Sequence, residues 1–270
     1  MTIVKNGRIY IRPYLRALQN QTYKKIEVVI QDGQSNDGTQ EFIQKFKKST
    51  KVKILLESSQ DKNGAEAISK AIKRCSGQIV CMINADDILN QHACQIAIDY
   101  FTKQPKAGAL YGANKLITKE GKYINTFRPM PFDLIKLLRC ELVPTANGSF
   151  YNLKVCKNDF KFTSQFKTCG DLDLWLKLSK FPILCTQKVL ASTRVDKQSS
   201  TRQAANYEQF CTDKIGILTK FINKYEKNII TEQLLKTSIA GVYAWAAESI
   251  LNIEGKTKRF RYYINLAQKL

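Results

Sequence analysis

The sequence predicts an α/β fold: a mixed, mainly parallel sheet flanked by helices, with a helical extension at its C-terminal end. Short apolar runs alternate with helical patterns through the first part of the chain, and such alternation is typical of parallel strands joined by crossover helices. The apolar runs lie at residues 26–30, 52–56, 78–83 and 107–117. A turn-rich middle part and a purely helical end follow, so the sheet is expected to lie in the first 202 residues.

The first two strands frame a polar loop. Residues 1–4 have the pattern of a short first strand, and residues 9–20 that of an amphipathic helix. The strand at 26–30 runs into the turn-forming loop at 31–39, and a helix is expected over 38–48. A strand followed by a polar, glycine-containing loop and a helix is the first half of a nucleotide-binding βαβ unit.

The strand at residues 78–83 ends near two adjacent carboxylates, Asp86 and Asp87. In open α/β sheets the carboxyl ends of the strands face the ligand crevice. Both side chains are therefore placed to hold a hard divalent cation, Mg²⁺ or Mn²⁺, beside a phosphate. The alternative is a solvated turn ahead of the helix expected over residues 90–103.

Past residue 110 the pattern changes, and a second functional half begins. A hairpin turn at 119–122 predicts antiparallel pairing, and a polar turn at 144–148 precedes a short strand. Carboxylates lie at the start of a helix over 170–178, where an acidic residue is often only a cap. We therefore expect two halves, residues 1–110 and 111–202, and a helical extension over 203–270.

Composition narrows the classes of partner. The net charge of +20 is spread along the chain and favours anionic ligands: a nucleotide, nucleic acid or an anionic membrane surface. Motifs that combine aromatic and basic residues for RNA are not evident, so no nucleic acid is expected. No apolar run is long enough to cross a bilayer and no signal-peptide pattern is present, which predicts a cytoplasmic protein with, at most, peripheral contact at the inner face of the membrane.

Cysteine and histidine usage argues against two kinds of site. The eight cysteines include no Cys-x-x-Cys pair, so they lack the usual zinc-site spacing and are expected to be reduced thiols. His92 is the only histidine and is expected on a helix surface. A Ser-His-Asp or Cys-His catalytic site is therefore improbable.

Four segments of the sequence carry motifs in a fixed order. They are Gln21-Thr22-Tyr23-Lys24-Lys25-Ile26-Glu27, Asp32-Gly33-Gln34-Ser35-Asn36-Asp37-Gly38-Thr39, Ile83-Asn84-Ala85-Asp86-Asp87 and Gly170-Asp171-Leu172-Asp173-Leu174-Trp175-Leu176-Lys177-Leu178. Together they resemble the signatures of the inverting glycosyltransferases of family 2, which have the Rossmann-related GT-A fold. The resemblance spans about residues 2–202, and it makes 1–110 the nucleotide-sugar half and 111–202 the acceptor half.

The resemblance implies the roles of the first site residues. Asp32 would bind the nucleotide base, with Thr2 nearby, and Asp86 and Asp87 would hold the ribose and the Mg²⁺ or Mn²⁺ that bridges the diphosphate. Residues 61–70 are similar to a further base-binding segment of the family. There, Lys62 or Asn63 could touch the base, although Asn63, Ala65 and Ser69 depart from the family pattern.

The resemblance also implies the catalytic base and the reaction. Asp171 matches the base, whereas the glutamate that precedes it in the family is Gly170 here, and Asp173 is the runner-up. The protein would move a sugar from a nucleoside-diphosphate sugar, with UDP-sugar favoured, to a hydroxyl of a glycan or lipid-linked acceptor in cell-surface polysaccharide synthesis. Thr145, Asn147 and Trp175 could line the acceptor site. Trp175 would stack on a sugar ring, with an ordinary core tryptophan as the alternative.

Two departures from the family keep other interpretations open. The family's Arg-x-His segment is Arg194-Val195-Asp196 here, and family members have more strand residues before the position of Thr2, which predicts a weakened central sheet. The alternative is a catalytically impaired sugar-nucleotide-binding or membrane-associated scaffold protein. A nucleotidyltransferase would need a glycine-rich basic loop after the first strand, and Lys5-Asn6-Gly7-Arg8 is a poor version of one.

Overall fold

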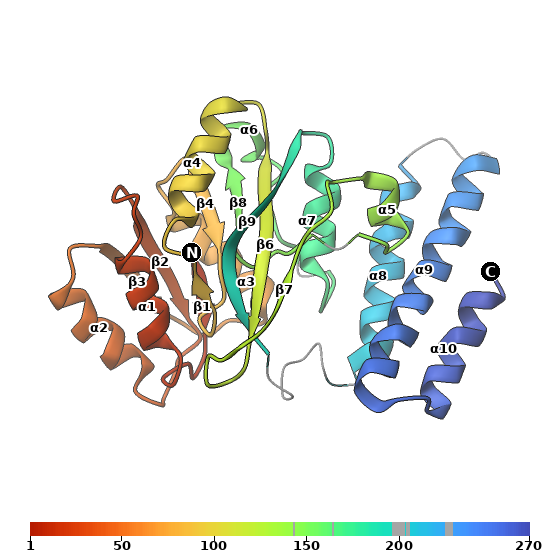
Figure 1. Ribbon diagram of the computed structural model, residues 1–270, viewed down its shortest axis with the longest axis horizontal. Helices are drawn as coiled ribbons and strands as arrows, with labels where there is room; N and C mark the ends of the chain where they lie inside the picture. The colour runs from red at the N-terminus through yellow and green to blue at the C-terminus, as the bar shows by residue number, and fades with distance from the viewer. Residues whose placement is uncertain (143, 164, 196–202, 204–205, 225–228) are drawn as a thin grey trace. The chain divides into compact units, whose positions relative to one another are not determined.

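The computed structural model describes the chain except residues 143, 164, 196–202, 204–205 and 225–228 (Figure 1). The chain divides into two compact units. Unit 1 comprises Met1–Pro131, Pro144–Ser164 and Lys177–Val195; unit 2 comprises Phe132–Val143, Gln165–Leu176 and Asp196–Leu270. Two segments from the middle of the chain thus belong to the same unit as the C-terminal helices, whereas the sequence analysis assigned residues 1–202 to one domain with two halves and 203–270 to a helical extension.

Unit 1 contains two sheets. The first has the order β1 (Thr2–Val4), β2 (Glu27–Asp32), β3 (Lys53–Ser58), with all strands parallel. The second has the order β4 (Ile79–Met82), β8 (Ser149–Asn152), β6 (Ala109–Ile117), β9 (Ile183–Arg194), β5 (Ile88–Leu89), with β7 (Tyr123–Phe127) paired to β6. Only β6 and β9 are parallel in this second sheet. The predicted mixed α/β class is confirmed, but its strands form two sheets instead of one.

Met1 links the two sheets. Its ammonium donates to the carbonyl of Cys81 at 2.6 Å, and the N–H of Ile83 donates to the carbonyl of Met1 at 3.3 Å. Two bonds that flank Met82 in this way are the pattern of a parallel pair. Strand β4 therefore runs in the same direction as β1, β2 and β3, and the carboxyl ends of these four strands lie at one edge.

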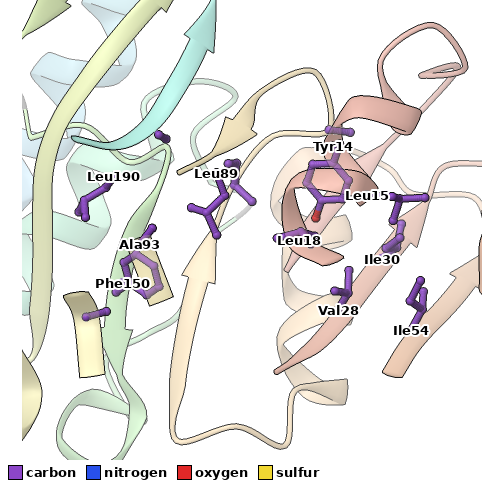
Figure 2. Close-up of a cluster of buried hydrophobic side chains, with 14 of the residues drawn as sticks. Tyr14, Leu15, Leu18, Val28, Ile30, Ile54, Leu89, Ala93, Phe150 and Leu190 are labelled. Atoms are coloured by element: carbon purple, nitrogen blue, oxygen red, sulfur yellow. The ribbon is translucent and has the colours of Figure 1, made fainter. Parts of the chain in front are cut away.

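Helices cover these strands and bury their apolar sides. They are α1 (Ile11–Gln19), α2 (Thr39–Ser49), α3 (Gly64–Arg74), α4 (Ala93–Lys103) and the short α6 (Leu153–Cys156). The buried residues of α1 recur at helical spacing, and Figure 2 shows Tyr14, Leu15 and Leu18 lying near Val28 and Ile30 of β2. This core fixes the strand ends that carry the polar residues.

Unit 2 is helical. It contains α5 (Leu134–Leu138), most of α7 (Gly170–Leu178), α8 (Tyr207–Ile222), α9 (Ile229–Glu254) and α10 (Lys258–Gln268). Apolar residues recur at helical spacing in α9, and Val242, Ala246 and Ile250 are fully buried. Within the described parts of the chain, no helix has the length and apolar character that spanning a bilayer requires.

Gly241 in α9 should not tolerate a larger residue. A Cβ at this position would lie 2.1 Å from the backbone oxygen of Arg139, which cannot move aside as a flexible side chain can. Because overpacking costs about 1–3 kcal/mol or more, we expect Gly241→Ala to lower the Tm by several degrees in thermal unfolding. Exposed Lys236→Ala on the same helix is the control, and an equal Tm for both variants would contradict this packing.

Candidate functional site

The carboxylate of Asp32 organises the loop after β2. Asp32 is fully buried, and it accepts hydrogen bonds from the Ser35 N–H at 3.0 Å, the Ser35 hydroxyl at 2.5 Å and the Ser58 hydroxyl at 2.7 Å. These bonds join the start of the polar loop to the end of β3. Asp32, the residue predicted to bind the nucleotide base, therefore fixes the conformation of this loop through its buried side chain.

A second set of bonds ties this loop to the loop after β1. The N–H of Asn6 donates to the Ser35 hydroxyl at 2.8 Å, and the N–H of Arg8 donates to the Asp37 carboxylate at 2.9 Å. Gly38 has φ of +86°, a left-handed conformation that glycine adopts without strain. The two loops are thereby held as one surface at the carboxyl ends of β1 and β2.

A cavity of about 450 Å³ lies at this edge. It is lined by residues from the ends of β1 and β2 and from the start of α3: Ile3, Val4, Lys5, Gln31, Gly33, Gln34, Gln60, Asp61, Asn63, Gly64 and Ala67. Its volume suits a small-molecule ligand. Backbone, amide and charged groups line the cavity. Such groups can form hydrogen bonds with the donors and acceptors on the edge of a nucleotide base.

Gln31 and Asp61 form the polar wall of this cavity, and the sequence did not single out Gln31. The Gln31 side chain donates to the Ser59 hydroxyl at 3.0 Å and accepts from Arg74 at 2.8 Å. Asp61 forms an ion pair with Lys70 at 2.8 Å. The only signal for Gln31 in the sequence is its position, an amide residue directly before Asp32 at the end of the strand.

The other residues predicted near the base have structural contacts. Thr2 is 3% exposed on β1. Asn63 lines the cavity, yet its side-chain oxygen caps α3 by accepting from the Glu66 N–H at 3.0 Å. The N–H of Lys62 donates to the Glu66 carboxylate at 2.8 Å. The base contacts assigned to Thr2, Lys62 and Asn63 stay predictions.

Asp86 and Asp87 lie in different environments, although they are adjacent. Asp86 is exposed, whereas Asp87 is 2% exposed. Burial raises the pKa of the Asp87 carboxyl to about 7, and the neighbouring Asp86 carboxylate adds to the rise. The pair thus consists of one carboxylate open to ligands and one held inside the protein.

Asn147 and the end of β9 hold Asp87. The Asn147 amide donates to Asp87 and also to the Thr193 hydroxyl at 2.9 Å, and its oxygen accepts from the Asn84 N–H at 2.9 Å. The N–H of Arg194 donates to Asp87 at 2.6 Å. Asn147 therefore positions the carboxylate pair, a role that the sequence did not reveal, while its assignment to the acceptor site stays a prediction.

The Arg194 side chain adds a fixed cation beside the same pair. Its guanidinium donates to the backbone oxygens of Asp86 at 2.9 Å and Thr118 at 3.1 Å, and it stacks on the Tyr10 ring at 4.9 Å. Among the described residues, backbone oxygens and this ring hold the guanidinium in place. Asp196, noted in place of the family's histidine, lies outside the described residues.

The residues can be tested for their fit to Mg²⁺ or Mn²⁺. Mg²⁺ is commonly bound by one or two carboxylates together with substrate phosphates. Exposed Asp86, backed by Asp87, would provide the carboxylates of such a set. Within the described residues, no group of three or more His, Cys, Asp or Glu side chains could enclose an ion without a substrate.

The structure also places the residues predicted to line the acceptor site and the carboxylates predicted as the catalytic base. Thr145 is half-buried, and its hydroxyl donates to the Gly112 carbonyl at 3.4 Å. Trp175 is 1% exposed, which matches the core-tryptophan alternative, because a covered ring offers no face to a sugar. Asp171 is half-buried in the first turn of α7 and accepts from the Leu172 N–H at 3.0 Å, whereas Asp173 is 8% exposed. Of the two carboxylates, Asp171 is the more accessible.

The thiols and the histidine match their expectations. All eight cysteines are free thiols. His92 is exposed and directly precedes α4. Neither residue type is among the described residues that line the cavity at the ends of β1 and β2.

Residues 1–154 match Glycosyl transferase family 2. An uncharacterized glycosyltransferase of Rickettsia conorii is 25% identical over 217 residues, covering 77% of this chain and 35% of the relative. Chondroitin synthase of Escherichia coli is 24% identical over 233 residues, covering 82% of this chain and 33% of the relative. The chain thus spans about a third of the length of these relatives.

Solved structures share the fold. Staphylococcus aureus TarS 1-349 in complex with UDP-GlcNAc has a TM-score of 0.67 and 17% identity, covering 98% of this chain and 78% of that one. The mannosyltransferase PcManGT from Pyrobaculum calidifontis, in complex with GDP-Man and Mn²⁺, has a TM-score of 0.65 and 16% identity, covering 99% and 82%. These similarities confirm the predicted GT-A-like fold.

Proposed function

This chain belongs to glycosyl transferase family 2, and from that premise we propose that it transfers a sugar from a nucleoside-diphosphate sugar to a hydroxyl of a glycan or lipid-linked acceptor, with inversion at the anomeric carbon. UDP-sugar is the favoured donor, since TarS is solved with UDP-GlcNAc. Cell-surface polysaccharide synthesis is the proposed context, because the relatives include chondroitin synthase and poly-beta-1,6-N-acetyl-D-glucosamine synthase.

The observation that carries the donor proposal is the 450 Å³ cavity at the carboxyl ends of β1 and β2. Ligands of open α/β sheets bind at this edge. The Gln31 amide, bonded to Ser59 and Arg74, and the Asp61 carboxylate, paired with Lys70, line the proposed base site, and Asp32 holds the polar loop that follows β2. Thr2, Lys62 and Asn63 complete the proposed base site.

For the diphosphate we propose Asp86, Asp87 and Arg194. Asp86 would bind the ribose and, backed by Asp87, the Mg²⁺ or Mn²⁺. When bound, such a cation acts as a Lewis acid that neutralises charge on the leaving diphosphate. The Arg194 guanidinium is a second positive charge held by the Asp86 backbone, and a fixed cation near a leaving group lowers the barrier without reorganising.

For the acceptor we propose Asp171 as the general base. Its carboxylate would take the proton of the attacking hydroxyl while the bond to the nucleoside diphosphate breaks on the opposite face. Such in-line displacement inverts configuration, so an α-linked donor gives a β-glycoside. Thr145 and Asn147, both half-buried, are the proposed acceptor-site residues.

The charge of the chain supports an anionic donor and a peripheral membrane contact. With a net charge of +20, long-range attraction raises the local concentration of nucleotide sugars. The same charge would favour an anionic membrane surface, where lipid-linked acceptors reside. Weaker binding of the chain to anionic vesicles at high salt is the expected sign of that contact.

A thermal-shift experiment tests the donor site. UDP with Mn²⁺ should raise the Tm, because a ligand that binds only the folded state stabilises it by mass action, about 2.7 kcal/mol at one hundred times its Kd. EDTA should abolish the shift. A screen of other nucleoside diphosphates serves as the control for base specificity, and no shift with any of them would rule out the proposed donor site.

A further inference from the structure

A cavity of about 430 Å³ lies within unit 2, where α9 packs against both α8 and α10 (Figure 1). Three of the side chains that line it are Tyr243 of α9 and Tyr262 and Tyr263 of α10, and we call it the tyrosine cavity. Its volume is in the range of small-molecule sites. The residues that line it differ from those proposed above for donor binding and for catalysis.

The faces of two helices form the walls of the tyrosine cavity. Glu208 lines it together with the residues three, four and seven positions further along α8. Arg259 lines it together with the residues at the same spacings along α10. Residues at these spacings share one face of a helix. Because Glu208 and Arg259 are each the second residue of their helix, the two walls begin with side chains of opposite charge.

Polar groups from both walls converge in the tyrosine cavity. Burial raises the pKa of the Tyr263 hydroxyl to about 12, and the neighbouring Cys211 thiol and Glu208 carboxylate add to the rise. Tyr262 acts in the same direction, whereas the Arg259 guanidinium opposes it. Hydrogen-bond donors and acceptors of α8 and α10 therefore lie close to one another around the Tyr263 hydroxyl.

The three rings provide an aromatic surface beside these polar groups. The centre of the Tyr263 ring lies 6.3 Å from that of Tyr243 and 5.2 Å from that of Tyr262. Tyr263 is 6% exposed, whereas Tyr262 is 59% exposed. The Tyr262 ring is thus open to a ligand while its neighbour is packed. Tyrosine offers a large contact area with a polar end at a low cost in conformational entropy.

The charges of the tyrosine cavity favour a neutral ligand. Arg259 forms an ion pair with Glu254 at 2.9 Å, which balances its charge. Glu208 adds a carboxylate, which would repel an anionic ligand. The cavity therefore does not share the preference for anions that the net charge of +20 gives to the chain as a whole.

We propose that the tyrosine cavity is a second sugar-binding site, which takes a neutral saccharide and holds the acceptor glycan away from the residues that react. A sugar hydroxyl can accept a hydrogen bond from Arg259 and donate one to Glu208, so it uses both walls. The apolar face of the sugar ring can stack on the exposed Tyr262 ring. The identification of the saccharide as the acceptor rests on the proposed function, whereas saccharide binding in the cavity does not.

Titration calorimetry of the whole chain with neutral oligosaccharides tests this site. The probes are a pentasaccharide of β-1,6-linked N-acetylglucosamine, chosen because a relative is named as the synthase of that polymer, and cellopentaose and maltopentaose. At least one probe should bind. Tyr262→Ala should raise its Kd tenfold or more through the lost stacking. Tyr123→Ala is the matched control, because Tyr123 is 63% exposed and lies in unit 1, and it should leave the Kd unchanged.

Salt dependence tests the neutral character of the ligand. Screening does not act on an uncharged ligand, so the Kd of the bound probe should change by less than about twofold between 50 and 500 mM NaCl. A hexasaccharide of hyaluronan, which carries carboxylates, should bind at least tenfold more weakly. Preferential binding of hyaluronan that weakens with salt would overturn the neutral assignment.

Two further outcomes would overturn saccharide binding in the tyrosine cavity: no binding of any neutral probe, or an equal Kd for Tyr262→Ala and the unaltered chain. Neither readout involves transfer, so both remain informative if the chain transfers no sugar. Where transfer is observed, Tyr262→Ala should raise the KM for the oligosaccharide acceptor and leave kcat unchanged. An unchanged KM beside a raised Kd would show that the bound saccharide is not the acceptor.

Discussion

Replacement of Asp171 by asparagine should lower kcat for sugar transfer by about 10²–10⁴-fold, the usual contribution of a positioned general base. Asparagine keeps the size of the side chain but cannot take the proton of the acceptor hydroxyl. Donor binding uses other residues, so the Tm rise with UDP and Mn²⁺ should be unchanged. Transfer is measured with sugar nucleotides that carry the base identified by the thermal-shift experiment.

Asp173→Asn is the matched control, since it makes the same change two residues further along α7. Asp173 is 8% exposed, so its replacement should affect stability more than kcat. An Asp171→Asn variant with normal turnover would refute the assignment of Asp171. Loss of activity in Asp173→Asn alone, with its Tm retained, would transfer the role of base to Asp173.

Asp86→Ala should remove the effect of Mn²⁺ on ligand binding, whereas Asp87→Ala should lower the stability of the protein itself. Asp86 is exposed, so Asp86→Ala should leave the Tm of the ligand-free protein within about 1–2 °C, since surface changes are usually within 0.5 kcal/mol. It should abolish the additional Tm rise that Mn²⁺ gives with UDP. Asp87→Ala would leave the Arg194 N–H and the Asn147 amide without their acceptor, at about 1–3 kcal/mol for each buried group.

The contrast is measured by thermal unfolding of both variants, with and without UDP and Mn²⁺. Asn147→Ala is a useful third variant, because it removes a partner of Asp87 while leaving both carboxylates in place. It should lower the Tm as Asp87→Ala does. If Asp86→Ala retained the full Mn²⁺ effect, the cation would bind elsewhere, and the metal assignment would be wrong.

Local sequence patterns predicted those parts of the site that are formed by residues close to one another in the sequence. The polar loop from Asp32 to Thr39 and the carboxylates after β4 follow apolar runs directly, so strand ends and turn residues identify them. The helical end of the chain was predicted in the same local way, before any contact was known. These features need no knowledge of which strand lies next to which.

Contacts between distant segments could not be predicted in this way. Asn147 and Arg194 reach Asp87 from 60 and 107 residues away, and neither carries a local pattern that names its partner. The division into two sheets has the same origin, since strand periodicity does not specify pairing. Trp175 shows a further limit, because a tryptophan on a helix fits both a core and a sugar platform until its exposure is known.

Both tryptophans of the chain, Trp175 and Trp245, belong to unit 2. Trp245 packs on Tyr207, and the Lys214 ammonium lies 3.3 Å from the centre of its ring. Ultraviolet emission excited at the indole band therefore monitors the helical unit alone, while the proposed donor cavity lies in the other. Thermal unfolding measured in parallel by tryptophan emission and by circular dichroism will reveal whether a nucleotide bound in one unit also stabilises the other against unfolding.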